Sequence, residues 1–213
     1  MSSIKLWIRS QDREDLIEVD NLGLAYLGKY NFVDKIGDYK FKISYNSFFQ
    51  INPYICNELF EYVKKYTKDA KDLIDLYSGV GTLSIVAKEN AENVLGVEIV
   101  DNAAFNAKTN SVLNKVNGIT FIASDTNKII SYIENKDFVI VDPPRSGLST
   151  KVINAIKDYN VNKILYISCD PNTLIRDLKL LDNYKIKEFK LFDMFPNTYH
   201  VESMVLLENK LMR

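Results

Sequence analysis

The feature that most constrains the fold is an alternation of short apolar runs with helix-like segments, which begins after Lys71. Apolar runs of this length, separated by segments with helical spacing, are typical of buried parallel strands with helices on both faces of the sheet. The sequence therefore predicts an α/β fold with a mostly parallel sheet. The predicted strands are residues 73–77, 94–97, 119–122, 138–141 and 164–167.

The first fifty residues follow a different pattern. Residues 4–9, 16–19 and 39–45 are predicted to be short strands, because turn-forming residues such as Asn21 and Gly37 separate them. We expect residues 1–50 to form a small β-rich appendage and residues 51–213 to form a single α/β domain.

Two further elements follow from local signals. Residues 53–66 carry apolar side chains at helical spacing, with Asn52 as the N-cap and Pro53 at the first helical position. Cys56 within this helix is interpreted as a packed thiol. Near the end of the chain, residues 184–195 and 199–207 are separated only by a turn at 196–198, which predicts a terminal antiparallel hairpin.

Composition excludes several classes of protein. The chain lacks the run of ~20 apolar residues that a membrane span requires, and it has no signal-peptide pattern, which favours a cytoplasmic location. With two separated cysteines and one histidine, it offers no spacing typical of a metal or iron–sulfur site. The net charge of −1 does not favour nucleic-acid binding, although Lys185, Lys187 and Lys190 are either a local basic patch or scattered surface lysines.

Ligands of open parallel sheets bind beyond the carboxyl ends of the strands, so polar residues at these ends are candidate site residues. Tyr77, Gly79 and Gly81 follow the first strand in a glycine-containing loop that allows close approach of a ligand. Glu98 ends the next strand, where a carboxylate can accept hydrogen bonds from ribose hydroxyls. A purely structural turn and a solvated helix cap are the alternatives.

Two further motifs follow strands. Asp142 and the two prolines Pro143 and Pro144 form a stiff segment that can hold a planar base, the alternative being a rigid loop with an Asp142–Arg145 ion pair. Cys169 ends a strand just before a helix that starts near Pro171, and a helix N-terminus stabilises a thiolate. A lone cysteine is otherwise more often a packing residue.

The last motif lies in the predicted hairpin. In a strand, His200 and Glu202 would point to the same face, so both would face one pocket. Glu202 is a candidate general base because the residues that follow it are apolar and indicate a covered strand. A solvent-facing glutamate on an edge strand is the alternative.

In this order the motifs resemble the RNA uracil-5-methyltransferase family, whose members make 5-methyluridine in transfer RNA and ribosomal RNA. The resemblance covers about three-quarters of the chain, from Ser47-Phe-Phe-Gln-Ile-Asn52 through Asp75–Gly81, Gly96-Val-Glu98, Asp-Pro-Pro-Arg-x-Gly and Tyr-x-Ser-Cys169 to His200-x-Glu202. It implies a Rossmann-like class I methyltransferase fold, with a seven-stranded mostly parallel sheet and a terminal antiparallel hairpin.

The resemblance also implies roles for individual residues. Cys169 would be the nucleophile and Glu202 the proton acceptor, with S-adenosylmethionine as the methyl donor and no metal. RNA would be the partner, with 23S ribosomal RNA favoured over transfer RNA, which remains the alternative. The implied cofactor-binding residues are Gln50, Tyr77, Gly79, Gly81, Glu98 and Asp142, and the implied substrate-binding residues are Phe49, Pro143, Arg145 and His200.

Some features depart from the family pattern. Asp170 stands where the family usually has asparagine, and a carboxylate beside Cys169 is expected to oppose thiolate formation. Asn197 also replaces a more usual residue, and the chain lacks the RNA-binding β-barrel that precedes this domain in full-length members. An inactive cofactor-binding remnant that serves as an interaction module is therefore the second hypothesis. Methylation of a DNA base amine is disfavoured, because Arg145 follows Asp-Pro-Pro and such amines need no cysteine.

Overall fold

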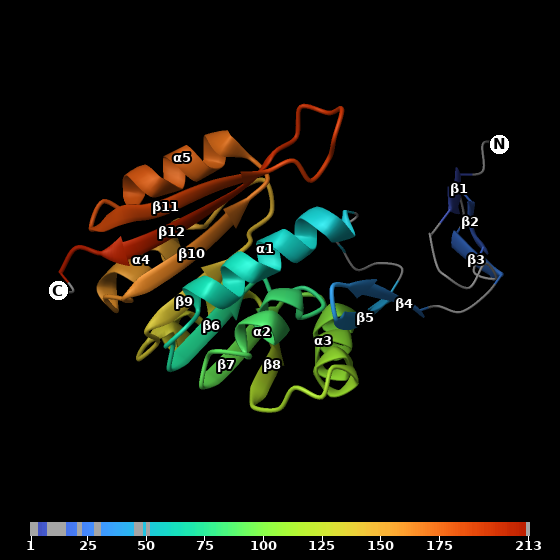
Figure 1. Cartoon of the computed structure of the whole chain (residues 1–213), viewed down its shortest axis with the longest axis horizontal. Helices are drawn as coiled ribbons and strands as arrows, with labels where there is room; N and C mark the ends of the chain where they lie inside the picture. Colours follow the sequence, from blue (N-terminus) through green and yellow to red (C-terminus); the bar gives the residue numbers. More distant parts are fainter. Residues whose placement is uncertain are drawn as a thin grey trace.

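The computed structural model describes the backbone of residues 4–7, 16–20, 23–27, 31–44, 49 and 52–211, and the side chains within these ranges from residue 33 onward. The described part contains a seven-stranded sheet in the order β11-β12-β10-β9-β6-β7-β8 (Figure 1). Strands β10, β9, β6, β7 and β8 are parallel, as the apolar runs predict. They are β6 (Asp72–Leu76), β7 (Asn93–Glu98), β8 (Ile119–Ala123), β9 (Phe138–Val141) and β10 (Lys163–Ser168).

The strand order reverses at the centre of the sheet. From β6 the chain proceeds outward through β7 to β8, and it then returns to place β9 on the other side of β6. The carboxyl ends of β6 and β9 therefore border a crevice, which is the usual position of a ligand site in such sheets.

Helices cover both faces of the sheet (Figure 1). Neighbouring residues of one strand point to opposite faces, so Leu73 packs in a core with α1 and α2 whereas Ile74 packs in a second core with α4 and α5. The helices are α1 (Pro53–Tyr66), α2 (Thr82–Ala87), α3 (Asp101–Leu113), α4 (Thr150–Asp158) and α5 (Pro171–Leu180), with short 3-10 turns at η1 (Thr126–Lys128) and η2 (Ile130–Ile133).

The start of α1 agrees with the sequence prediction. Asn52 is the N-cap, its side chain accepts a hydrogen bond from the backbone amide of Ile55, and Pro53 opens the helix. Cys56 is only 1% exposed, which confirms that it is a packed thiol.

The N-terminal region contains strands β1 (Ile4–Trp7), β2 (Leu16–Asp20) and β3 (Gly23–Leu27), which pair with one another, and a hairpin of β4 (Asn31–Ile36) and β5 (Tyr39–Ser44). The sequence patterns did not predict β3 and β4. Phe41 of β5 packs in the same core as Phe60 of α1. Asn110 of α3 and Asn114, the C-cap of that helix, hydrogen-bond the backbone of β5. The division of the chain at residue 50 stays a prediction.

The terminal hairpin exists but is shorter than predicted. Its strands are β11 (Tyr184–Phe192) and β12 (Glu202–Asn209), so residues 193–201 form a loop rather than extensions of the two strands. Asn197 adopts a left-handed backbone conformation with φ of 68°, and the Thr198 hydroxyl donates to the Phe195 carbonyl. These local bonds replace the pairing between the two strands over residues 193–201. His200 therefore lies in the loop, and the prediction that it lies in a strand with Glu202 is wrong.

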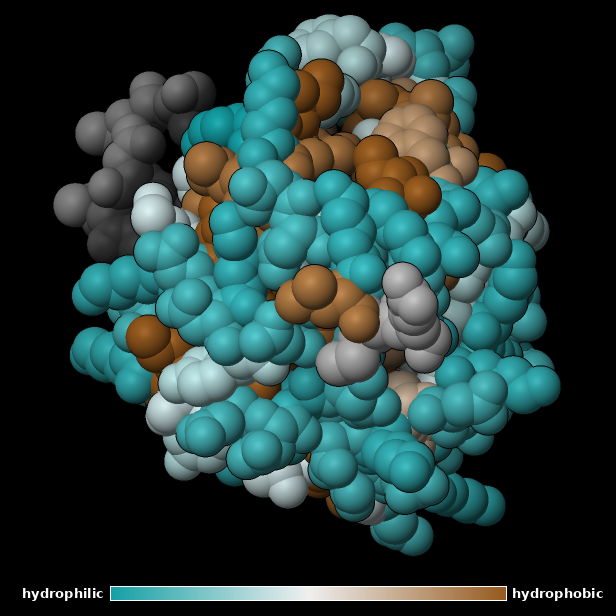
Figure 2. Space-filling model, turned by 90° about the vertical axis from the view of Figure 1, so that its left-hand side faces the viewer, coloured by the Kyte–Doolittle hydropathy of each residue, from teal (hydrophilic) through white to brown (hydrophobic). Residues whose placement is uncertain are grey.

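The three lysines of β11 do not form a free basic patch. Lys185 and Lys187 both pair with Glu208 of β12, and Lys190 lies over the ring of Tyr62. Figure 2 shows the side of the molecule on which α4, α5 and β11 lie, where hydrophilic side chains predominate and hydrophobic ones gather towards the top. Among the helices of the described residues, none combines the length and apolar character that a membrane crossing requires.

Candidate active site

A cavity of ≈ 810 Å³ lies at the carboxyl ends of the parallel strands. This volume is within the range of small-molecule sites, ~300–1,000 Å³. Gln50 falls outside the described residues, and Gly81 and His200, both described, do not line the cavity. The predicted site residues that do line it are Phe49, Tyr77, Gly79, Glu98, Asp142, Pro143, Arg145, Cys169 and Glu202.

The glycine loop and Glu98 form one unit of the cavity wall. The Glu98 carboxylate accepts a hydrogen bond from the Gly79 amide at 2.8 Å and another from the Val100 amide at 2.8 Å. Glu98 is 9% exposed and lines the cavity, so it is not a solvated helix cap. Its carboxylate is fixed beside the loop, where it can accept hydrogen bonds from a ligand hydroxyl.

Gly81 has a packing role. With φ of 85° it is the N-cap of α2, and a Cβ atom at this position would lie 2.9 Å from the Cβ of Ala107 and 2.9 Å from Phe121. The residue therefore allows α2 and α3 to approach each other closely. It supports the loop from behind the cavity wall.

Two buried polar atoms near the loop lack a hydrogen-bond partner within the described structure: Asp75 Oδ1 and Ser78 Oγ. The other Asp75 oxygen accepts from the Ser84 hydroxyl at 2.5 Å. Burial raises the pKa of Asp75 to about 7. Unsatisfied buried polar atoms are uncommon in folded proteins, and Ser78 lines the cavity, so a polar ligand there would satisfy its hydroxyl.

Sequence reasoning missed one wall of the cavity. Asp125, Asn127 and Ser149 also line it, and the Ser149 hydroxyl donates to the Asn127 side chain at 2.6 Å. Asp125 lies just beyond the end of β8 and is the N-cap of η1. The strand-end rule that selected Glu98 and Asp142 would therefore also have selected Asp125.

Acidic groups also line the cavity. Burial raises the pKa of Asp142 to about 7, and burial together with the charge of Asp142 raises the pKa of Glu202 to about 8. Burial is the cause of the Asp142 shift, with no contribution from Arg145, and among the described residues no ion pair joins Asp142 to Arg145. The cavity therefore holds carboxyl groups that are only partly ionised near neutral pH.

Cys169 lies at the cavity wall and is partly exposed. Burial is the main cause that raises its thiol pKa, the charges of Glu202 and Asp142 raise it further, and the Arg145 guanidinium opposes them. Asp170 has a different role from the one predicted. As the N-cap of α5, its carboxylate accepts from the amides of Asn172 and Thr173.

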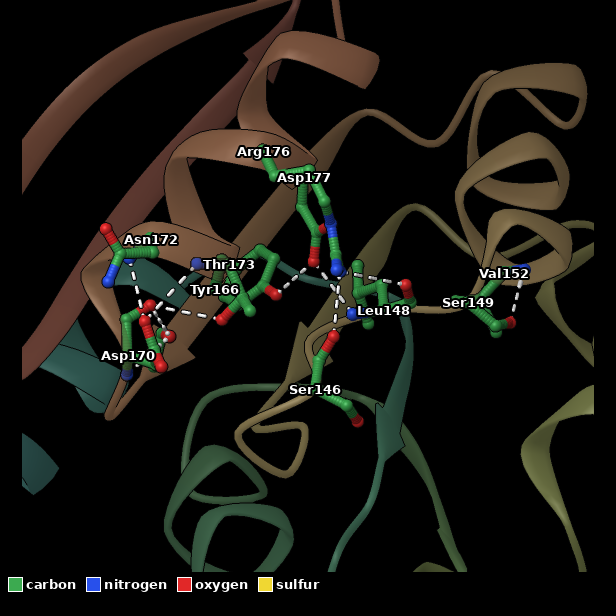
Figure 3. Close-up of polar contacts among 11 residues, drawn as sticks. Ser146, Leu148, Ser149, Val152, Tyr166, Asp170, Asn172, Thr173, Arg176 and Asp177 are labelled. Atoms are coloured by element: carbon green, nitrogen blue, oxygen red, sulfur yellow. Dashed lines mark hydrogen bonds and ion pairs between the residues drawn. The ribbon is translucent and has the colours of Figure 1, made fainter.

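A buried clamp joins the Asp142–Gly147 loop to α5 (Figure 3). The Asp177 carboxylate is 0% exposed and accepts hydrogen bonds from the Leu148 amide at 2.7 Å and from the Tyr166 hydroxyl at 2.7 Å. Arg176 binds Asp177 and donates to the Ser146 carbonyl at 2.8 Å. The clamp holds the loop that bears Arg145 against the helix that follows Cys169.

We expect Asp177→Ala to destabilise the protein by roughly 3 kcal/mol, because the variant leaves the Leu148 amide and the Tyr166 hydroxyl buried without an acceptor. Tyr166→Phe should cost about 1 kcal/mol, since the carboxylate keeps its other donors. Urea unfolding of both variants measures these losses. Equal stability of Asp177→Ala and the wild type would show that the clamp does not hold the loop.

The acidic cluster makes stability depend on pH. Asp75, Asp142 and Glu202 have folded-state pKa values of about 7, about 7 and about 8, against ordinary values of 3.8, 3.8 and 4.5. Between pH 5 and pH 8 the folded state therefore binds more protons than the unfolded state, so the free energy of unfolding falls as the pH rises.

Over this interval we expect a loss on the order of several kcal/mol, measured by urea unfolding of the unliganded protein at each pH. Asp142→Asn should make the dependence shallower, because it removes one titrating group and the charge that raises the pKa of Glu202. Stability that rises between pH 5 and pH 8 would contradict the raised pKa values.

Comparisons with known proteins agree with this geometry. The model of the tRNA (uracil-5-)-methyltransferase family matches residues 9–210. An uncharacterised RNA methyltransferase of Caldanaerobacter subterraneus subsp. tengcongensis is 41% identical over 199 residues, which are 91% of this chain and 44% of that protein. One of Clostridium acetobutylicum is 39% identical over 202 residues, 92% of this chain and 44% of that protein. The chain thus spans less than half the length of these relatives.

Solved structures show the same likeness. The Pyrococcus abyssi tRNA (uracil-54, C5)-methyltransferase in complex with S-adenosyl-L-homocysteine is similar with a TM-score of 0.79 and 34% identity, over 87% of this chain and 46% of that chain. The tRNA m1G37 methyltransferase of M. jannaschii, at 20% identity and a TM-score of 0.65 over 87% of this chain and 60% of its own, shares the fold. From the family match over nearly its whole length and from these relatives, the chain belongs to the tRNA (uracil-5-)-methyltransferase family.

Proposed function

We propose that this chain transfers a methyl group from S-adenosylmethionine to carbon 5 of a uridine in RNA, with Cys169 forming a covalent bond to the base. The observation that carries the proposal is that Cys169 and Glu202 line the same cavity as the glycine loop and Glu98. The proposed nucleophile, the proposed base and the carboxylate proposed to bind the ribose therefore line one cavity, as this reaction requires.

The glycine-loop end of the cavity fits the cofactor. Glu98 offers its carboxylate to the ribose hydroxyls, Gly79 leaves open space beside the backbone, and the Ser78 hydroxyl lacks a partner within the described structure. Tyr77 and Asp142 complete this wall, with Gln50 as a further proposed contact and Gly81 supporting the loop. The cofactor, when bound, supplies an electrophilic methyl group.

Cys169 would activate the base. Carbon 5 of uracil is a weak nucleophile, and addition of a thiolate to carbon 6 places electron density on carbon 5 through the enolate that forms. The thiolate is the reactive form. Arg145 favours this form against the effects of burial and of the two carboxylates, and its guanidinium can also face the pyrimidine.

Glu202 would complete the reaction. After methylation, carbon 5 carries both the methyl group and its original proton. The Glu202 carboxylate takes that proton, the electrons of the C–H bond re-form the double bond between carbons 5 and 6, and the thiolate of Cys169 leaves. The raised pKa of Glu202 makes it a stronger base once it is ionised.

The RNA substrate is proposed from the family. The resemblance in sequence favours ribosomal RNA over transfer RNA, whereas the matching family and the Pyrococcus abyssi enzyme are named for transfer RNA. A uridine in a loop suits the cavity, because a base must leave its helix before a side chain can reach carbon 6.

The direct test is incubation with S-adenosylmethionine labelled in its methyl group and unmodified transcripts of transfer RNA and ribosomal RNA. We expect the label to appear as 5-methyluridine in one of them. If neither RNA is labelled although the chain binds the cofactor, the result would support the interaction-module hypothesis. The chain spans only 44% of the length of the two relatives named above.

A further inference from the structure

The loop between β11 and β12 has a defined conformation. Met194 at its start is fully buried in the core that contains α1. The Thr198 amide and hydroxyl both donate to the Phe195 carbonyl, and the Thr198 hydroxyl accepts from the His200 amide at 3.2 Å. Together with the left-handed Asn197, these bonds form a compact turn that fixes the direction in which the next residues point.

This turn presents an aromatic side chain to solvent. Tyr199 is 90% exposed, and its ring centroid lies 4.2 Å from that of His200, with 44° between the planes. His200 also contacts Phe195 edge-on, with 6.0 Å between the centroids. His200 therefore contacts the Tyr199 ring on one side, and the rest of the ring remains exposed to solvent.

The aromatic pair lies next to Arg145, a residue of the cavity wall. Arg145 Nη2 lies 3.4 Å from His200 Nε2, and Arg145 lines the cavity together with Cys169 and Glu202. Tyr199 is thus connected, through His200 and Arg145, to the groups that would act on the substrate. A molecule that contacts the Tyr199 ring would therefore lie at the rim of the cavity, beside Arg145, next to any ligand inside the cavity.

We propose that Tyr199, supported by His200, is a stacking site for the nucleobase next to the target uridine. This inference rests on the proposed function, which places an RNA strand at the rim. When a uridine leaves its stack, its neighbour loses a stacking partner, and an exposed ring on a fixed turn replaces that partner. Stacking accepts any base, which suits a chain whose net charge of −1 offers little general attraction to phosphates.

The alternative occupant, a protein segment, is less favoured by the position of the ring. A protein bound at the rim would compete with the substrate for the space beside Arg145, whereas a flanking nucleotide is covalently tied to the base in the cavity. The two occupants differ in a measurable way, because only a stacked base changes its own fluorescence.

The test uses the full chain and single-stranded RNA oligonucleotides with one uridine and 2-aminopurine on either its 5′ or its 3′ side. Stacking on a tyrosine should quench the 2-aminopurine of one oligonucleotide when the wild type binds. Tyr199→Ala should abolish the quenching and raise the Kd about tenfold, whereas Tyr199→Phe should keep both near the wild-type values. Tyr159→Ala is the control, since Tyr159 is 38% exposed at the end of α4, near the amino ends of the strands.

Methyl-transfer kinetics give a second readout. Tyr199→Ala should raise KM about tenfold with kcat within about twofold of the wild type, because the ring binds a neighbouring base and does not contact the reacting atoms. Unchanged quenching and Kd in Tyr199→Ala, or failure of the wild type to bind either oligonucleotide, would overturn the stacking site. The fluorescence measurement does not depend on catalysis, so an inactive wild type with normal quenching would contradict only the proposed function.

Discussion

Methyl transfer by the Cys169→Ala variant is expected to fall by more than ~10³-fold, while its affinity for S-adenosylmethionine stays within about threefold of the wild type. The thiolate is the only group in the proposed reaction that can raise the electron density at carbon 5. The proposed cofactor site lies around Gly79 and Glu98, which line the same cavity, and the hydrogen bond between these two residues does not involve the sulfur atom.

Initial rates with labelled cofactor and calorimetric titration of the cofactor measure the two quantities. Cys56→Ala is the matched control, because Cys56 is 1% exposed and burial raises its thiol pKa to about 12, which leaves it unreactive. This control should lose some stability but retain transfer. Transfer by Cys169→Ala at even a tenth of the wild-type rate would refute the assignment of the nucleophile.

Glu202→Gln is expected to lower turnover by ~10²–10⁴-fold and to accumulate a covalent, methylated adduct between protein and RNA. The amide cannot remove the proton from carbon 5, so the reaction stops after methylation with the base still attached to Cys169. The adduct would appear in a denaturing gel as a band that carries both protein and labelled methyl group.

Glu208→Gln is the control for this variant. Glu208 lies on the same strand, β12, but its carboxylate pairs with Lys185 and Lys187 outside the cavity. It should keep normal turnover and give no adduct. A Glu202→Gln variant with reduced turnover but without the adduct would show that another group removes the proton.

The sequence predicted the sheet well because its signal is local. The apolar runs of β6, β7, β9 and β10 are buried on both faces, which makes them continuous rather than alternating, whereas the edge strand β8 is only partly buried. The hairpin loop was not predicted because Met194 and Phe195 continue the apolar pattern beyond Phe192, where β11 ends. Here the hydrogen bonds of Thr198 and the left-handed Asn197 decide the chain path, and an apolar pattern does not contain that information.

Strand-end residues were predictable for a similar reason. The carboxyl ends of parallel strands meet at one edge, so Glu98, Asp142 and Cys169 had to lie near one another. Contacts between side chains distant in sequence were not predictable. Asp177 of α5 binds Leu148, 29 residues earlier, and the Asp170 carboxylate turns to cap α5 rather than to face the thiol.

The central claim, that Cys169 adds to the uracil ring inside this cavity, is tested most directly with RNA in which 5-fluorouridine replaces uridine. Fluorine at carbon 5 cannot leave as the proton does, so the adduct cannot break down after methylation. The account predicts a complex that survives denaturation, requires S-adenosylmethionine, and is absent in Cys169→Ala. Formation of the same complex by Cys169→Ala, or normal methylation of the unsubstituted RNA by the wild type without any trapped complex, would contradict it.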